Sequence, residues 1–430
     1  MKKNYIIILI AIILLLGGVI TIKIMNKKEV PKRIDPVKFD ISTGSETNFD
    51  YKMIKQASSH YDKNYMISPL SIAYALSILE KGSTDNTKTE IDNALEDYKL
   101  LNIVNVKDRI SLANLLFINK RYESDIKKTY IDEIKKDFDS DLIIDEFKTP
   151  DKVNNWISDK TFGMLKDVLD NINPNTMLGI ANALAIDVEW DKKFECTNTR
   201  KEEFTLSSGR KIDSAIMHSS NDVSYFKLDN AEGIVKDYKI YNYKTGESYN
   251  WFESVYAKDD TIALEYIAIL PDNINDFINK FDANTLNNIK SNLVSSDSKR
   301  DINLSLPKYT YDFDYTYFKN DLINLGIKDA FDAVNASFKN ISDKLMYVSD
   351  AIHKSHIELS ENGTKAAAVT VFILKDNAMA REEEKEIINI KFNKPFIYLI
   401  KEKNSNNIWF FGTVYEPMKF ENDKMECNVQ

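Results

Sequence analysis

Residues 360–374 read Ser-Glu-Asn-Gly-Thr-Lys-Ala-Ala-Ala-Val-Thr-Val-Phe-Ile-Leu, close to the C-terminal end of the 430-residue chain. A glycine and a run of small side chains stand in front of a β-branched, apolar sequence. Gly363 frees the backbone, and the alanines meet little steric resistance. The β-branched residues that follow favour a strand. The stretch is therefore suited to be exposed in one state and packed into a sheet in another.

An amphipathic helix from Thr364 through Arg381–Glu386 is the alternative for the same residues, because Ala, Leu, Lys and Glu are good helix formers. Val369, Thr370 and Val371 oppose it, since β-branched residues lose rotamer freedom in a helix. The apolar run that follows would also put apolar groups all round such a helix. We therefore predict that this segment forms a strand. A loop that is helical in the resting state remains the alternative.

The composition is that of a globular protein with a large core, with 43% hydrophobic and 29% charged residues. No linker rich in Pro, Gly or Ser divides the chain after residue 50, so we expect one large domain. The net charge of −9 argues against a nucleic-acid partner. Only Cys196 and Cys427 are present, which gives no disulfide framework and no spacing suited to a metal. We expect no cofactor.

The N-terminal region carries a membrane signal, because Tyr5–Ile22 is an almost wholly apolar run behind Lys2 and Lys3. We predict that residues 1–28 are an uncleaved signal-anchor, with a cleaved signal peptide as the alternative. Residues 29–46 are polar, contain two prolines and show no periodicity, which indicates a tether. Basic residues after the apolar run outnumber those ahead of it and oppose export. We nevertheless expect the following domain to be extracellular or at the cell surface.

Helical and strand patterns alternate from about residue 47 onward. Asn64–Glu90 contains Ser-Pro-Leu-Ser and then apolar residues at i, i+3, i+4 and i+7, which predicts one helix buried along one face. Strands are predicted where apolar residues are dense or alternate with polar ones. These strands are Ile180–Trp190, Thr261–Leu270, Asp301–Pro307, Ile387–Phe392, Pro395–Lys401 and Ile408–Tyr415. Helices come early and strands dominate late, so the fold class is α+β.

A set of motifs in this order and spacing resembles the serpins, the serine protease inhibitor family, across residues 47–417. The motifs are Ile67-Ser68-Pro69-Leu70-Ser71-Ile72, Ala181-Asn182-Ala183 leading to Trp190, Leu306-Pro307-Lys308-Tyr309, His353-Lys354, Glu361-Asn362-Gly363-Thr364, Phe392-Asn393-Lys394-Pro395-Phe396 and Phe411-Gly412-Thr413-Val414. Each motif alone is weak or moderate. Together they make chance a poor explanation.

The resemblance implies a serpin fold of three β-sheets and eight to nine helices, with an exposed reactive-centre loop. In this family a protease attacks the loop as a substrate and forms an acyl-enzyme. The cut loop then inserts into the main sheet as a new strand. We expect a microbial, membrane-targeted, monomeric inhibitor of a serine endopeptidase, with a cysteine endopeptidase as a further option. The partners would be the target protease and, through the N-terminal segment, a membrane; residues 418–430 have no assigned role.

The resemblance assigns the hinge of the reactive loop to Glu361, Gly363, Thr364, Ala366, Ala367 and Ala368. Successive side chains of a strand alternate between its faces. If Thr364 points inward on insertion, the other inward residues are Ala366, Ala368, Thr370 and Phe372, all small or apolar. Lys365 departs from the acidic residue common in inhibitory relatives, yet its ammonium group would stay hydrated on the outer face.

The usual inhibitory spacing, thirteen residues beyond Thr364, places the scissile bond between Asn377 and Ala378. The loop runs about seven residues longer than is common, so Lys375 and Arg381 are alternative scissile-bond residues. Cutting after Arg381 would add about 13 Å of slack at roughly 3.3 Å per residue. That slack would let a trapped enzyme relax, so cleavage near Asn377 is favoured.

Four further residues resemble the serpin shutter, the cluster beneath the main sheet where its strands part: Ser68, Ser71, Asn182 and His353. Serine and histidine can exchange hydrogen bonds between open and closed arrangements. Ordinary satisfaction of buried polar groups is the alternative. Trp190 is assigned to the breach, where core packing is favoured over a role as a dedicated gate.

The chain is not expected to be an enzyme, because it has no Gly-x-Ser-x-Gly elbow. The serious competitor to inhibition is a non-inhibitory serpin that acts as a carrier, folding helper or surface-binding protein. Charged, bulky or proline residues at inward hinge positions would mark such a protein. None is present in this hinge.

Overall fold

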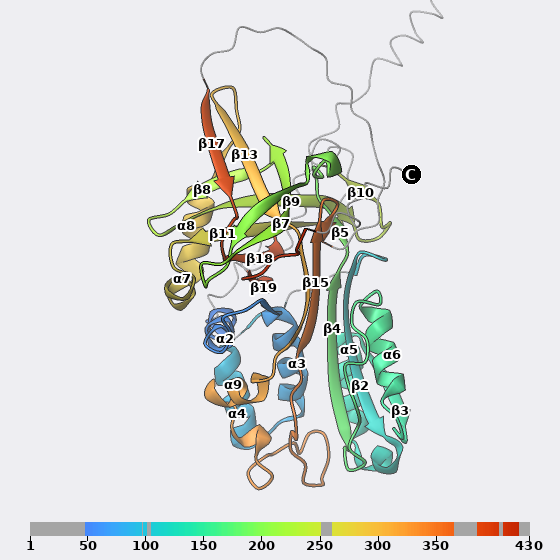
Figure 1. The fold of residues 1–430 in the computed structure, drawn as a ribbon. Helices are drawn as coiled ribbons and strands as arrows, with labels where there is room; N and C mark the ends of the chain where they lie inside the picture. Colours follow the sequence, from blue (N-terminus) through green and yellow to red (C-terminus); the bar gives the residue numbers. More distant parts are fainter. Residues whose placement is uncertain are drawn as a thin grey trace, which may run out of the picture.

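Two long strands, β4 (Leu178–Ile186) and β15 (Lys354–Ser360), run side by side through the middle of the molecule (Figure 1). No hydrogen-bonded ladder joins these two strands in the part of the chain that the structure describes. The computed structural model describes residues 48–96, 98–100, 105–250, 260–364, 385–403 and 407–420.

Each of the two strands belongs to its own half of a divided sheet. β4 pairs antiparallel with β2 (Ile110–Asn119), which pairs parallel with β3 (Ser140–Asp145). β15 pairs antiparallel with β14 (Tyr309–Asp314) and with the short β16 (Gly363–Thr364). β16 in turn pairs with β5 (Val188–Glu189), which continues the line of β4. The halves are therefore bridged at one end by β16 and separate below it.

Two other sheets complete the β-structure of the described residues. The larger has the order β1-β19-β18-β11-β9-β8-β12, with β10 beside β9, and the smaller has the order β17-β13-β7-β6. The strands of the larger sheet are β1 (Tyr65–Ile67), β8 (Ser224–Lys227), β9 (Ala231–Asn242), β10 (Ser248–Tyr249), β11 (Thr261–Pro271), β12 (Val294–Ser295), β18 (Phe396–Glu402) and β19 (Ile408–Val414). Those of the smaller are β6 (Arg200–Thr205), β7 (Lys211–Ser220), β13 (Arg300–Pro307) and β17 (Glu386–Lys391).

Helices pack around these sheets, so the α+β class predicted from the sequence is confirmed (Figure 1). The α-helices are α2 (Phe49–Ser58), α3 (Pro69–Gly82), α4 (Asp85–Leu95), α5 (Lys128–Phe138), α6 (Asp151–Lys160), α7 (Ile274–Lys280), α8 (Ala283–Ser291) and α9 (Phe318–Asn324). Short 3₁₀ segments are η1 (Lys120–Asp125), η2 (Cys196–Asn198) and η4 (Asp329–Phe331). None of the helices in the described ranges is long and apolar enough to cross a bilayer, and Tyr5–Ile22 lies outside those ranges.

A helix within Asn64–Glu90 is confirmed as α3, but the predicted bounds are wrong, because the same region also contains β1 and the start of α4. Ser68 caps α3 by accepting a hydrogen bond from the Ser71 N–H at 3.2 Å, and a proline follows it at the first helical position. At the other end, Ser83 is extended and its hydroxyl donates to the Glu80 carbonyl at 2.7 Å. The apolar spacing ends at Leu79, and Gly82 with the polar residues that follow marks the break that the predicted bounds ignored.

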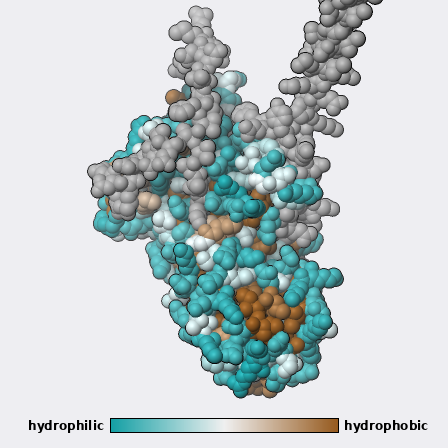
Figure 2. All heavy atoms as spheres, turned by 90° about the vertical axis from the view of Figure 1, so that its right-hand side faces the viewer, coloured by the Kyte–Doolittle hydropathy of each residue, from teal (hydrophilic) through white to brown (hydrophobic). Residues whose placement is uncertain are grey.

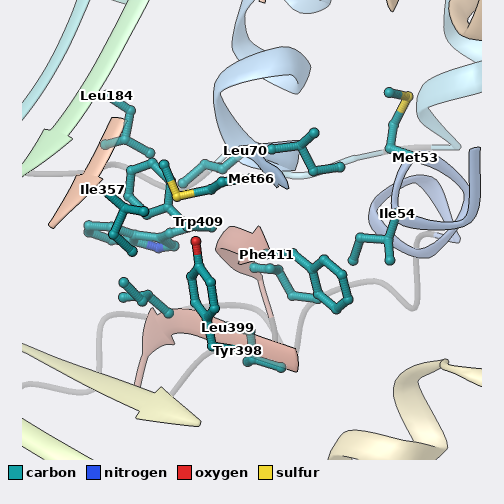
Figure 3. Close-up of a cluster of buried hydrophobic side chains, with 14 of the residues drawn as sticks. Met53, Ile54, Met66, Leu70, Leu184, Ile357, Tyr398, Leu399, Trp409 and Phe411 are labelled. Carbon is teal, nitrogen blue, oxygen red and sulfur yellow. The ribbon is translucent and has the colours of Figure 1, made fainter. Parts of the chain in front are cut away.

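The main hydrophobic core joins both halves of the divided sheet to the helices and to the larger sheet. Figure 3 shows Leu184 of β4 and Ile357 of β15 in one cluster with Met66, Tyr398 and Trp409. All five side chains are buried. The two halves therefore share one core although their backbones are not paired.

Candidate functional site

A cavity of about 760 Å³ lies between β4 and β15. Its walls include β4, the segment that leads into β15 and the start of α3. The first five residues of β4 are only partly buried. Figure 2 views the molecule from the right-hand side of Figure 1. A patch of hydrophobic residues lies at the surface in the lower half of this view. Most of the side chains that line the cavity are apolar.

The hinge residues Gly363 and Thr364 close the upper end of this cavity as strand β16. Thr364 pairs with Leu359 on one side and with Val188 on the other. Its side chain is 4% exposed, and its hydroxyl lies 2.6 Å from the Tyr238 hydroxyl. Thr364 thus points inward in the hinge as it stands.

Gly363 is required at its position for two reasons. Its φ of +153° lies in a region that L-residues rarely adopt. A Cβ atom there would lie 2.1 Å from the Val188 carbonyl oxygen. β5 and β16 can thus approach closely only because Gly363 has no side chain.

Glu361 anchors the hinge to the body of the protein. Its carboxylate accepts a hydrogen bond from the Thr199 hydroxyl at 2.7 Å and pairs with the Lys308 ammonium at 2.8 Å. Its carbonyl accepts the Phe194 N–H at 3.0 Å. Burial raises the pKa of the Glu361 carboxyl, but the bonds from Lys308 and Thr199 outweigh burial and hold that pKa below its ordinary value. Lys308 and Thr199 thus bind Glu361 in its charged form.

Trp190 holds the same turn from the other side. Its indole is fully buried and lies parallel to the Tyr238 ring at a centroid distance of 4.4 Å. The indole N–H donates to the Ser360 carbonyl at 3.0 Å, and the backbone N–H donates to the Asn362 carbonyl at 2.9 Å. Trp190 therefore packs in the core and also contacts the hinge.

The four residues assigned to the shutter come together beneath the divided sheet. The Ser71 hydroxyl donates to the Asn182 side-chain oxygen, and Asn182 lies on β4. The Ser68 N–H donates to His353 Nε2 at 3.2 Å, and His353 directly precedes β15. The start of α3 therefore contacts both flanks of the cavity through these hydrogen bonds.

His353 accepts a hydrogen bond through Nε2, so that nitrogen carries no proton in this arrangement. Burial lowers the pKa of His353 to about 4. A neutral imidazole is consistent with both observations.

Several residues of the site were missed from the sequence. Thr199 and Tyr238 contact the hinge, and Asn114 of β2 accepts a hydrogen bond from the Asn182 amide at 2.8 Å. Lys308 stood within a quoted motif but had no assigned role. No local pattern marks these residues, because each contacts a partner far away in the sequence.

Part of the predicted site lies outside the described residues. These positions are the hinge residues Ala366, Ala367 and Ala368, and the scissile-bond candidates Lys375, Asn377, Ala378 and Arg381.

Cys196 is disulfide-bonded, which the sequence did not lead us to expect. Cys427, the other cysteine of the sequence, lies outside the described ranges. Within those ranges no group of His, Cys, Asp and Glu side chains is arranged to hold a metal ion.

A family model described as serpin (serine protease inhibitor) matches residues 44–417. The chain belongs to the serpin family. It is 26% identical over 404 residues to a serpin-like protein of Methanosarcina acetivorans, covering 88% of this chain and 87% of that protein. It is 25% identical over 401 residues to the leukocyte elastase inhibitor of Xenopus tropicalis, covering 86% and 98%.

A solved structure agrees with this assignment. The native state of the thermophilic serpin tengpin matches with a TM-score of 0.71 and 26% identity, covering 90% of this chain and 95% of that one. The serpin fold predicted from the sequence motifs is thus confirmed, and the protein is a member of a protease-inhibitor superfamily.

We predict that Gly363→Ala loosens the contact between β16 and β5. The added Cβ overlaps the Val188 carbonyl, so unfolding stability should fall by more than about 1 kcal/mol. Hydrogen–deuterium exchange of the β5 amides should become faster. Gly326→Ala is the matched control, because Gly326 also has a positive φ, of +104°, but its Cβ would meet nothing within 4 Å. Equal exchange of β5 in both variants would contradict the assigned contact.

We predict that this serpin loses stability in acid through His353. In the unfolded chain His353 becomes protonated below its ordinary pKa of 6.5. In the folded chain it stays neutral down to about pH 4. Stability present at pH 7 is therefore lost as the pH falls from 6.5 toward 4, by up to about 3 kcal/mol. Denaturant unfolding at a series of pH values measures the effect. His353→Gln should show a shallower loss than the parent protein, and identical curves would exclude His353 as the cause.

Proposed function

We propose that this serpin is a suicide-substrate inhibitor of a serine endopeptidase, which traps the acyl-enzyme by inserting its cleaved reactive loop between β4 and β15. The observation that carries the proposal is the position of β16. Its two residues already form a strand between β15 and β5, at the upper end of an opening whose flanks have no ladder between them in the described chain. Edges of this kind are templates for an added strand.

The pairing of β16 gives the register that an inserted loop would follow. Thr364 lies opposite Leu359 and Val188, and both pairings are antiparallel. Each further residue of the loop therefore moves one residue back along β15 and one back along β4. On this register Thr370 would lie between Asn182 and His353, the two shutter residues on the flanks of the cavity.

The inward face of the loop suits this path. Ser355, Ile357 and Leu359 are the buried positions of β15, and the register places them opposite the inward residues Ala368, Ala366 and Thr364. Small side chains at those positions would fit against the shared core without burying a charge. This composition supports inhibition over the alternative of a non-inhibitory carrier, folding helper or surface-binding serpin.

The length of the cavity supports cleavage at Asn377. On the same register residue 374 would lie opposite Leu178, the first residue of β4. Asn377 would then lie level with Asn175, just beyond the first residue of β4, and Asn175 lines the cavity. A loop cut after Arg381 would carry four residues beyond that point.

We also propose that the protein acts as a monomer outside the cell or at its surface, held to the membrane by residues 1–28 or secreted after their removal. The apolar run Tyr5–Ile22 supports this location. The partner would be a protease with access to that surface.

We predict that Thr364→Arg converts the inhibitor into a substrate. The arginine would have to enter the buried site beside Tyr238, which should block insertion while leaving cleavage possible. Lys365→Arg is the matched control, because the next residue of a strand faces outward. The measurement is the yield of detergent-resistant adducts with a panel of serine and cysteine proteases. Adducts formed by Thr364→Arg at the parent yield would contradict the inward assignment.

We predict that the peptide released from this serpin by an inhibited protease begins at Ala378, within two residues. Mass spectrometry of the released peptide provides the test. The same cleaved sample should resist heat far better than the intact protein, because a strand has been added to the sheet. A peptide that begins at Glu382 would contradict the length argument. A cleaved protein with an unchanged melting temperature would contradict the insertion itself.

A further inference from the structure

The C-terminal tail, residues 418–430, begins beside one of the residues that hold the hinge. The Met418 N–H donates to the Lys308 carbonyl at 3.0 Å. Two residues later, the Phe420 N–H donates to the Asp213 carbonyl of β7 at 3.1 Å. The start of the tail therefore lies along the edge of β7 that faces β13, just beyond the residues that β13 pairs with.

Cys196 lies at the opposite edge of β7, in a turn that also binds the hinge. It is half-buried, and its carbonyl accepts the Thr199 N–H at 3.0 Å. The Thr199 hydroxyl in turn donates to the Glu361 carboxylate at 2.7 Å. Strand β6 follows this turn directly and pairs with β7 on the side away from β13. The two partners of Glu361, Thr199 and Lys308, therefore belong to segments on opposite edges of β7.

A covalent bond can join these two segments. Cys196 is disulfide-bonded, and the sequence contains only one other cysteine, Cys427. Cys427 is seven residues beyond Phe420, a length that covers about 23 Å in an extended chain at roughly 3.3 Å per residue. Neighbouring strands lie only about 5 Å apart, so the tail is long enough to cross β7 and reach Cys196.

We propose that Cys196 and Cys427 form a disulfide clasp, which ties the tail across β7 and keeps the two partners of Glu361 together. This inference concerns the hinge of the intact protein and is independent of loop insertion. A disulfide removes conformations in which its two ends are far apart. The clasp therefore disfavours separation of Lys308 from Thr199, and the turn that leads into β16 stays bound.

The clasp would make the hinge sensitive to redox conditions. A dithiol opens it in two steps: one thiolate attacks a sulfur of the disulfide, and the second thiol of the reductant then resolves the mixed disulfide. Two electrons and two protons pass to the cysteines, which become thiols, and the reductant becomes a cyclic disulfide. The clasp would stay closed outside the cell, where disulfides persist, and open among cytosolic thiols.

Peptide mapping without reductant tests the pairing. Trypsin should release residues 194–200 and 425–430 as one linked product, because each peptide lies between cleavage sites and contains one of the two cysteines. Dithiothreitol should separate this product into two peptides. Two free thiols in each chain, or a disulfide-linked dimer, would overturn the proposal.

Hydrogen–deuterium exchange of the full chain tests the effect on the hinge. The Trp190 and Phe194 N–H groups donate to hinge carbonyls, so their exchange reports on opening of the hinge. We expect dithiothreitol to speed their exchange, and that of β16, about tenfold. Exchange in β3, which pairs only with β2 in the described chain, should stay unchanged. Equal acceleration in β3, or none at the hinge, would overturn the clasp.

The double variant Cys196→Ser, Cys427→Ser is the matched control for the reductant. Its hinge should exchange as fast as that of the reduced parent, and dithiothreitol should change nothing further. A variant that responds to dithiothreitol as strongly as the parent would contradict the role of these cysteines. Reduction of the parent tests the same point without a substitution.

Discussion

The backbone hydrogen-bonding groups of β4 and β15 are the constraint on which the rest of the site depends. The two strands lie on either side of one cavity and share one core, yet in the described chain no ladder joins them. Paired backbone groups are the rule inside proteins, so two facing strand edges favour the addition of a strand between them. Strand β16 occupies the first two places of such a strand.

Specific polar contacts hold this arrangement at the hinge and at the start of α3. At the hinge, Glu361 is bound by Lys308 and Thr199, and Trp190 binds the backbone of the same turn. Beneath the sheet, α3 reaches β4 through Asn182 and the start of β15 through His353. The bonds from α3 reach both flanks of the cavity, which would separate if the proposed strand entered. They are therefore suited to set the barrier between an open and a filled sheet.

Much of the fold could be predicted from the sequence, because local patterns carry it. The strands β11, β13, β18 and β19 follow from dense or alternating apolar residues, and their observed bounds lie within two residues of those expected. The helix expected for Asn64–Glu90 was too long, because the apolar spacing ends at Leu79 and the helix itself ends at Gly82. The shutter residues were found through family motifs, whereas Thr199 and Tyr238 had no such signal.

The sequence by itself identified the family, through short motifs that keep their order along the chain. It also predicts which hinge residues would face inward on insertion, because side chains alternate along a strand. Only the tertiary structure decided where the main sheet divides, which groups bind Glu361, and which residues of β4 and β15 an inserted loop would meet. Those features depend on pairs such as Thr199 with Glu361, which are 162 residues apart in the sequence. Contacts over that range are set by the packing of whole elements, and no local pattern encodes them.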